Sequence, residues 1–372
     1  MSVTIFHCAD LHLDTPFALS LTKAEKRNSE LRSAFRNAIL YAKSVSTQLF
    51  FIAGDLFDSQ YVTLDTAESL INEFKSYPEC RFFITPGNHD PYDQHSPYKL
   101  LSWPQNVHIF TAKERVRIDE LNTDVYGFGF TSNSMTESPV TGYLPLDPER
   151  INILVCHGTV GVPLSKDGPI LVSDIEKSGF DYIALGHIHK TDGVKQAGKT
   201  SYAYSGCIEG RGFDELGYKG GLSGTVSHSD VRLKGIRLSL KRFETVRFTV
   251  SGQSTKPEIV SLLKTLIREY GSDTALRIVL DGEMPSGVMI TADDFTELSE
   301  RPYYLEIKDN SVPYANISET EGDMTLRGVF YRQMCDLIEN EPQKREIAIM
   351  ALRYGLSALA DRNVTDFEEL NV

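Results

Sequence analysis

Five short polar blocks, each placed directly after a run of apolar residues, constrain this chain of 372 residues more than any other feature. The runs before them are short and rich in aromatic and β-branched side chains, a pattern typical of buried strands. Open α/β sheets bind ligands at the carboxyl ends of their strands, so we expect the five blocks to meet at one site. The blocks are residues 10–12, 54–58, 87–90, 156–158 and 186–189.

Carboxylates, imidazoles and one amide in these blocks form a ligand set that suits a pair of divalent ions. Two ions about 4 Å apart can share one carboxylate and one hydroxide, and together they clamp an in-line displacement at phosphorus. Asp10 and His12 lie two residues apart on an extended segment and therefore share one side of the chain. Asp55 would bridge the ions, and Asn88 would add a neutral oxygen. The candidate ligands are Asp10, His12, Asp55, Asn88, His157, His187 and His189.

The whole chain predicts an α/β domain followed by two smaller parts. Helical patterns at residues 30–45 and 63–77 alternate with the first strands, and later strands follow one another without long helices, which predicts two packed sheets. From about residue 245, strands alternate with helical patterns, including residues 291–299, in a split βαβ unit. From residue 319 onward the apolar stripes predict two amphipathic helices.

The five blocks resemble the metal-binding motifs of the calcineurin-like metallophosphoesterase superfamily. Within that superfamily the chain is similar to the SbcD type of DNA double-strand-break repair exonuclease. The narrower match lies in residues 6–14 (FHCADLHLD), 96–100 (SPYKL) and 206–220.

This resemblance implies a metallophosphoesterase fold, a four-layer α/β/β/α sandwich of two mixed sheets, with a small α+β cap domain and a C-terminal helical tail. The nuclease domain would comprise residues 1–245, the cap residues 246–318 and the tail residues 319–372.

The resemblance also assigns the ligands to two ions that share Asp55. One ion would be held by Asp10, His12, Asp55 and His189. The other would be held by Asp55, Asn88, His157 and His187. Oxygen and imidazole ligands favour two Mn²⁺ ions, with Fe²⁺ or Zn²⁺ as alternatives.

The resemblance implies that three other residues of the blocks act in catalysis. His89 would face the scissile phosphate and assist departure of the 3′ oxygen, and Asp90 would orient its ring. Asp58 has two open interpretations, as a partner in the site that supports a metal ligand or handles the substrate, or as a structural cap of the next turn. A metal-bridging hydroxide would attack phosphorus and leave a 5′-phosphate.

The formal net charge of −13 is unusual for a protein that binds phosphate backbones. Residues 231–247 are an exception, with six basic side chains and one acidic, and the alternation of a strand would place Arg237 and Lys241 on one face. That face is either a DNA-backbone stripe or an ordinary solvated surface. Arg211 and Lys219, in the glycine-rich stretch after the last metal-binding block, are better placed for phosphate contact.

We therefore expect an Mn-dependent phosphodiesterase that acts on DNA. The resemblance implies 3′-to-5′ exonuclease activity, with single-strand endonuclease activity as an addition, a homodimer, and a partner that is an SbcC-type ABC ATPase with a coiled coil. From Asp309 onward the chain has twelve acidic and six basic residues, which suits a protein partner better than DNA. The apolar stripes of the tail could instead pack on the chain's own cap.

Two other functions stay open. The same metals could hydrolyse a small phosphodiester or phosphomonoester, because the five blocks specify phosphoryl chemistry and not its leaving group. Alternatively, the chain could serve mainly as a regulatory subunit of an ABC-type ATPase complex.

Cysteine usage and hydropathy indicate the compartment. The five cysteines include no C-x-x-C pair, and no apolar run is long enough to cross a bilayer or to follow a basic N-terminus as a signal sequence. We expect a reduced, cytoplasmic protein without membrane contact.

Overall fold

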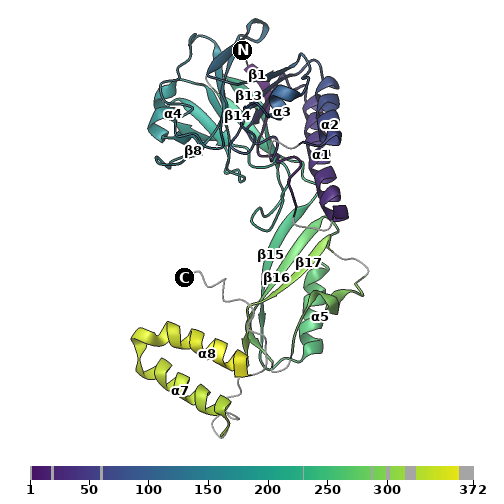
Figure 1. Ribbon diagram of the computed structural model, residues 1–372, viewed down its shortest axis with the longest axis vertical. Helices are drawn as coiled ribbons and strands as arrows, with labels where there is room; N and C mark the ends of the chain where they lie inside the picture. The colour runs from purple at the N-terminus through teal and green to yellow at the C-terminus, as the bar shows by residue number, and fades with distance from the viewer. Residues whose placement is uncertain are drawn as a thin grey trace. The chain divides into compact units, whose positions relative to one another are not determined.

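The computed structural model describes residues 2–17, 21–58, 62–228, 230–285, 288–298, 302–314 and 324–359. The chain divides into two compact units, Met1–Arg242 and Phe243–Val372. Figure 1 shows the elements of each unit.

The first sheet of the first unit is mixed. Its strands are β1 (Ser2–Cys8), β2 (Leu49–Ala53), β3 (Arg81–Thr85), β4 (Val107–Ile109), β13 (Gly220–Ser227) and β14 (Val231–Arg237). They lie in the order β14-β13-β1-β2-β3-β4, with β1 to β4 parallel and β13 antiparallel to both of its neighbours. The parallel strands therefore end at one edge, where the first three polar blocks begin.

The second sheet is also mixed. Its strands are β5 (Glu114–Ile118), β6 (Thr123–Phe128), β7 (Ile151–His157), β10 (Tyr182–Gly186), β11 (Lys195–Ala197) and β12 (Thr200–Tyr204). The order is β11-β12-β10-β7-β6-β5, with the four central strands parallel and both edge strands antiparallel. The last two polar blocks follow β7 and β10. A separate pair of short strands, β8 (Thr159–Val160) and β9 (Pro169–Ile170), lies beyond β7.

Helices cover the outer faces of the two sheets (Figure 1). They are α1 (Leu21–Ser44), α2 (Leu64–Lys75) and α4 (Val172–Ser178), with the short α3 (Pro97–Leu100) and the 3₁₀ turn η1 (Asp119–Leu121) between strands. Successive residues of β2 point to opposite faces, so Phe50 packs with Phe35 of α1 and Phe51 packs between the sheets. Ile175 of α4 packs on the outer face of the second sheet. The expected α/β/β/α sandwich is confirmed.

The second unit has its own small sheet and core. Its elements are β15 (Arg242–Val250), α5 (Lys256–Ile267), β16 (Thr274–Met284), η2 (Ala292–Phe295), β17 (Tyr304–Asp309), β18 (Val312–Pro313), α7 (Leu326–Asn340), η3 (Pro342–Lys344) and α8 (Arg345–Leu359). Strands β15, β16 and β17 are neighbours, and β18 pairs with β16. Ile259 and Leu263 of α5 pack with Leu276 and Ile278 of β16.

One sequence-based expectation for this unit changes. Within the described residues 291–298, the expected helix is only the 3₁₀ turn η2, in which Phe295 is buried, and Leu298 is buried beyond the end of that turn. The compact units divide after Arg242, and the expected domain boundary after residue 245 stays a prediction. A separate tail domain stays a prediction, and its residues 319–323 and 360–372 lie outside the described part. No helix in the described ranges combines the length and the apolar character needed to span a membrane.

Candidate metal centre

Four candidate ligands occupy sharp reversals of the backbone at the ends of their strands. Asp10, His12, Asp55 and His187 have φ angles of 53°, 46°, 51° and 105°, and only seven non-glycine residues in the described part of the chain have positive φ. An L-residue in this region costs about 1–2 kcal/mol, and such residues cluster at functional sites. The backbone N–H of His12 donates to Asp55 O at 3.0 Å, so the first two loops brace each other.

Glycines let these loops approach one another closely. A Cβ atom on Gly54, which has φ 92°, would lie 2.1 Å from His157 Nδ1. A Cβ atom on Gly87 would lie 2.1 Å from Asp55 Oδ1. The space that these glycines leave open is therefore occupied by side chains of the site itself.

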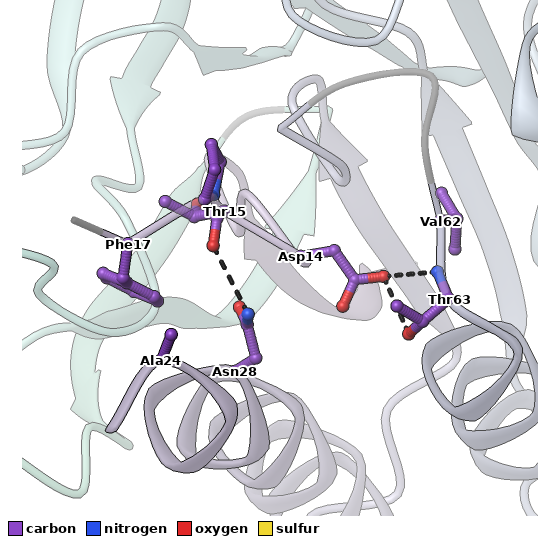
Figure 2. Close-up of a pocket in the computed structure, with 8 residues that line it drawn as sticks. Asp14, Thr15, Phe17, Ala24, Asn28, Val62 and Thr63 are labelled. Carbon is purple, nitrogen blue, oxygen red and sulfur yellow. Dashed lines mark hydrogen bonds between the residues drawn. The ribbon is translucent and has the colours of Figure 1, made fainter. Parts of the chain in front are cut away.

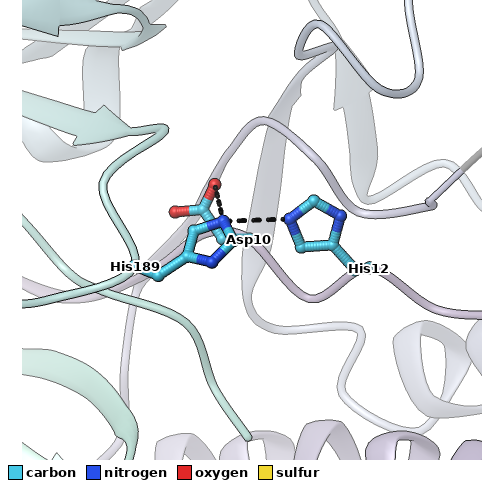
Figure 3. Close-up of side chains that lie close together, drawn as sticks. All are labelled: Asp10, His12 and His189. Carbon is cyan, nitrogen blue, oxygen red and sulfur yellow. Dashed lines mark hydrogen bonds and ion pairs between the residues drawn. The ribbon is translucent and has the colours of Figure 1, made fainter. Parts of the chain in front are cut away.

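The first cluster contains Asp10, His12 and His189, whose ligand atoms lie within 4.8 Å of one another (Figure 3). The two Nε2 atoms of the histidines face each other at 3.1 Å, and His189 Nε2 lies 3.8 Å from Asp10 Oδ1. His12 Nδ1 lies 2.9 Å from Asp58 Oδ1, and His189 Nδ1 lies 2.6 Å from Glu215 Oε1.

These contacts decide which ring nitrogens can bind a metal. A carboxylate only accepts hydrogen bonds, so each Nδ1 must carry the proton and each Nε2 keeps its lone pair. Two lone pairs and a carboxylate that face one another repel unless a cation lies between them. The donor set of Asp10, His12 and His189 therefore fits a divalent ion, with the outer carboxylates fixing the rings as in known metal sites.

A second cluster is built around His157. Its Nδ1 lies 2.9 Å from the backbone oxygen of Ala53, so its Nε2 keeps a lone pair. That Nε2 lies 3.0 Å from Asn88 Oδ1 and 3.4 Å from Asp55 Oδ2. The donor set of Asn88, Asp55 and His157 also fits a cation. The His187 ring lies beside the His157 ring, with 5.2 Å between centroids, and its Nε2 lies 4.0 Å from Asp167 Oδ2.

Asp55 connects the two clusters. Its Oδ2 atom lies 3.7 Å from His12 Nε2 on one side and 3.4 Å from His157 Nε2 on the other. Its Oδ1 accepts the backbone N–H of His89 at 3.0 Å. The position of this carboxylate fits the bridging role that we expected for it.

The charges of the centre call for a cation. Burial would raise the pKa of Asp55, but His157, His12 and His89 hold that pKa below its usual range. Burial would lower the pKa of His157, whereas the neighbouring carboxylates of Asp55 and Asp10 raise it. Buried carboxylates thus draw positive charge into the centre, and bound metal ions supply it without occupying the lone pairs with protons.

His89 lies beside the metal-binding clusters, and its side chain is 46% exposed. Two carboxylates lie beside its ring: Asp58 Oδ1 is 3.6 Å from His89 Nδ1, and Asp55 and His12 form with His89 a group of potential ligand atoms within 4.8 Å of one another. We expected Asp90 in that place. Asp90 is instead buried and accepts from Gly87 N at 2.7 Å and from Phe57 N at 3.0 Å.

Asp90 therefore shapes the loop and does not orient the His89 ring. Its carboxylate also accepts from Tyr98 OH at 2.5 Å, which ties the third polar block to α3. Burial raises the pKa of Asp90 to about 6. Asp58, by contrast, contacts both His12 and His89, so of its two open interpretations the structure favours the partner within the site.

The four candidate substrate-binding cations have different surroundings. Lys219 and Arg237 line a cavity of about 300 Å³ next to His189, together with Lys190 and Tyr218. Lys219 Nζ also lies 3.4 Å from the backbone oxygen of His189.

The other two cations do not line this cavity. Lys241 lies beyond it, where its backbone N–H donates to Glu209 Oε1 at 3.1 Å. Arg211 pairs with carboxylates of the metal centre.

Asp14, the last residue of the first motif, lies outside the metal clusters. Figure 2 shows its carboxylate directed at Thr63. It accepts from Thr63 N at 2.7 Å and from Thr66 Oγ1 at 2.7 Å, which fixes the beginning of α2. The adjoining cavity of about 500 Å³ is also lined by Phe17 and Asn28.

Sequence reasoning missed one functional partner, Glu215. We had noted it only as part of the glycine-rich motif, and nothing local in the sequence indicates that it contacts His189, 26 residues earlier. Its place in a motif that follows the last metal-binding block was the available signal.

Comparisons with known proteins agree with this geometry. The family model described as calcineurin-like phosphoesterase matches residues 3–191, a range that contains all seven candidate ligands. A protein of Bacillus subtilis named "Uncharacterized metallophosphoesterase YhaO" is 28% identical over 319 residues, which cover 79% of this chain and 76% of that protein.

Two archaeal relatives are named "DNA double-strand break repair protein Mre11". The protein of Methanocaldococcus jannaschii is 22% identical over 352 residues, covering 86% of this chain and 92% of the relative. The protein of Saccharolobus solfataricus is 25% identical over 298 residues, covering 76% of each chain.

Proposed function

The chain belongs to the calcineurin-like phosphoesterase family of metal-dependent phosphoester hydrolases, and on that premise we propose that it is a nuclease that hydrolyses phosphodiester bonds in DNA. The observation that carries the proposal is the pair of ligand clusters joined by Asp55, because two metal sites that share one carboxylate suit phosphoryl transfer. We propose two Mn²⁺ ions, since oxygen and imidazole ligands favour that metal, with Fe²⁺ or Zn²⁺ as alternatives.

We propose the following ligands for the two ions. Asp10, His12 and His189 would hold one ion, Asn88, His157 and His187 the other, and Asp55 both. When bound, the two ions would activate water and neutralise charge on the phosphoryl oxygens.

His89, supported by Asp58, would supply a proton to the leaving group. The exposed ring of His89 can reach a substrate, donate a hydrogen bond to the leaving 3′ oxygen and deliver a proton to it. Asp58 Oδ1, 3.6 Å from Nδ1 of that ring, would keep the ring oriented.

Two observations support DNA over a small ester. The relatives named for DNA double-strand break repair match over most of their length. The cavity beside His189 is lined by Lys190, Lys219 and Arg237, cations that suit a phosphate backbone, and the Arg237 guanidinium lies over the Tyr218 ring, 3.0 Å from its centroid. The net charge of −13 is what favours the small ester, and the experiment below separates the two.

The test compares end-labelled duplex DNA with bis-p-nitrophenyl phosphate in the presence of Mn²⁺. We expect nucleotide release from 3′ ends, and loss of at least 100-fold in kcat with His89→Ala while metal content stays at two ions per chain. His95→Ala is the matched control, because His95 is an exposed histidine nearby in the sequence. Turnover of the small ester without any cleavage of DNA would leave only the small-ester function.

We further propose that α7 and α8 bind a partner, an ABC-type ATPase with a coiled coil, and that the protein is a homodimer, as its resemblance to SbcD-type nucleases implies. Leu326 and Ile347 support a docking surface because 72% and 67% of their respective surfaces are exposed. Sedimentation of the chain alone and with the ATPase tests both. A monomer that does not co-sediment would overturn them.

A further inference from the structure

Arg211 connects the two outer carboxylates of the first metal cluster. Its NH1 atom lies 3.2 Å from Asp58 Oδ1, and its NH2 atom lies 3.1 Å from Glu215 Oε1. Asp58 contacts His12, Glu215 contacts His189, and the two histidines face each other at 3.1 Å. The five side chains therefore form a closed ring in which the facing Nε2 atoms of His12 and His189, which would hold the ion, lie opposite the guanidinium.

The local backbone reinforces this arrangement. Arg211 N donates to Glu215 Oε2 at 2.7 Å, and Glu215 N donates to Gly212 O at 3.1 Å. The segment from Arg211 to Glu215 thus forms a hydrogen-bonded turn, which fixes the positions of both side chains in the ring. Glu215 is buried, and its pKa is lowered to about 2, because the hydrogen bond from His189 and the charge of Arg211 outweigh the effect of burial.

A guanidinium suits this position better than any other side chain. Its planar fork places two N–H groups at fixed directions, so one cation can hold two separate carboxylates at once. The Arg211 side chain is only 21% exposed. A phosphate contact through the same N–H groups would have to break an ion pair with Asp58 or Glu215.

The second metal cluster is held differently. The His157 ring is fixed by the backbone oxygen of Ala53, and the backbone of β2 keeps that oxygen in place without any ion pair. Loss of the guanidinium should therefore disturb one metal site and leave the other intact.

We propose that Arg211 is a positioning residue for the ion bound by Asp10, His12 and His189, and that it sets the affinity of this site alone. Because Asp58 also lies beside His89, the same guanidinium would help to fix the orientation of the His89 ring relative to that metal site. The inference concerns the metal centre and holds for any phosphoester substrate, so it does not depend on DNA.

The experiment measures metal binding without a substrate. Metal-free protein is titrated with Mn²⁺ and followed by electron paramagnetic resonance, in which free Mn²⁺ gives a six-line signal and two neighbouring bound ions give a coupled one. We expect two ions per chain in the parent protein. In Arg211→Met, one dissociation constant should stay unchanged and the other rise about 10–100-fold, so that an isolated bound ion appears first.

Two further variants complete the test. Arg32→Met removes a guanidinium of similar exposure, 22%, whose NH1 atom lies 3.7 Å from Asp14 Oδ1 and outside the metal clusters, and both of its dissociation constants should match those of the parent protein. Arg211→Lys should weaken the same single site by less than Arg211→Met does, since an ammonium cannot hold both carboxylates in one geometry. If Arg211→Met fails to fold, as judged by circular dichroism, Arg211→Lys alone decides the question.

Unchanged constants in the Arg211 variants, or equal weakening of both sites, would overturn the proposal. A raised KM for DNA with unchanged metal binding would also overturn it, and would make Arg211 a phosphate contact. Failure of the parent protein to cleave DNA would remove the proposed function but would leave these metal titrations as they are.

Discussion

His7, a fully buried residue of β1, makes folding of this protein dependent on pH. Its Nε2 lies 3.2 Å from the oxygen of Leu185, and its Nδ1 lies 2.8 Å from Tyr182 OH. Burial lowers the pKa of His7 to about 3. Below about pH 6.5 His7 binds a proton in the unfolded chain but not in the folded one. The free energy of unfolding is therefore highest above pH 6.5 and falls as the pH drops toward 3.

We predict that His7→Gln flattens this dependence. Between pH 7.5 and pH 5.5 the free energy of unfolding of the parent protein should fall by about 1.4 kcal/mol more than that of the variant. Urea unfolding of chelator-treated protein at the two pH values measures the difference, because chelation removes the pH dependence of metal binding. His95→Gln, at an exposed position, should behave as the parent protein does. Equal losses in His7→Gln and the parent protein would contradict the prediction.

Gly54 leaves room for the His157 ring of the second metal site because it has no side chain. We predict that Gly54→Ala destabilises the fold by about 2 kcal/mol or more and weakens Mn²⁺ binding, because the new Cβ would meet His157 Nδ1 at 2.1 Å. Thermal unfolding and metal titration measure the two effects. Gly193→Ala is the control, since Gly193 has a similar φ of 85° and a Cβ atom added there would meet nothing within 4 Å. Both variants should carry backbone strain, and only Gly54→Ala should lose metal.

The residues of the site were predictable to different degrees. Asp10, His12 and His157 could be recognised because a ligand and the strand that precedes it are adjacent in the sequence. The exchange of Asp90 for Asp58 as the carboxylate beside His89 could not be predicted, because it depends on how two loops 31 positions apart meet in space. Local sequence specifies which side chains a loop carries, and packing specifies which of them touch.

At the level of elements, burial explains where the sequence succeeded. The residue pattern of β2 predicts a strand buried on both faces, and the structure buries all five of its residues. Helix α1 begins at Leu21, nine residues before the expected helix at residues 30–45, because its first turns lack the apolar spacing that would indicate a buried face. Periodicity finds the part of a helix that packs, and exposed turns leave no such signal.

Helix α5 of the second unit begins with a capping box. The side chain of Thr255 accepts a hydrogen bond from the backbone of Glu258, and the side chain of Glu258 accepts one from the backbone of Thr255. Ile259, the next residue, is buried. We predict that Thr255→Ala lowers the free energy of unfolding of this unit by about 1 kcal/mol.

The matched control for this prediction is Thr265→Ala in the same helix, where the hydroxyl only donates to Ser261 O and alanine favours the helix. Hydrogen exchange of α5 amides measures both variants. Equal protection in Thr255→Ala and the parent protein would show that the box contributes nothing.

For the whole molecule, the composition predicts a negatively charged surface, which repels DNA, but the fold brings three cations together at one place. The net charge of −13 averages over a chain in which Lys190, Lys219 and Arg237 come from separate segments and meet at one cavity. No window of sequence contains all three, so no local count of charges reveals them.

This distribution of charge makes a prediction about DNA binding. Each cation that contacts a phosphate releases counterions, so the logarithm of the binding constant should fall with the logarithm of salt concentration at a slope of roughly −0.9 per contact. Arg237→Met should therefore lower the slope by about one unit. Binding is measured by fluorescence anisotropy of a labelled duplex in the His89→Ala background, where the DNA stays intact.

Arg232→Met is the decisive control, because Arg232 lies on the same strand, β14, carries the same charge and is 81% exposed beside Asp230. General attraction to a basic strand would make the two substitutions equivalent, whereas a DNA path through the cavity would make only Arg237 matter. Equal changes would therefore reject the cavity as the path. An unchanged slope in both would place the DNA path away from β14 and from the cavity beside His189.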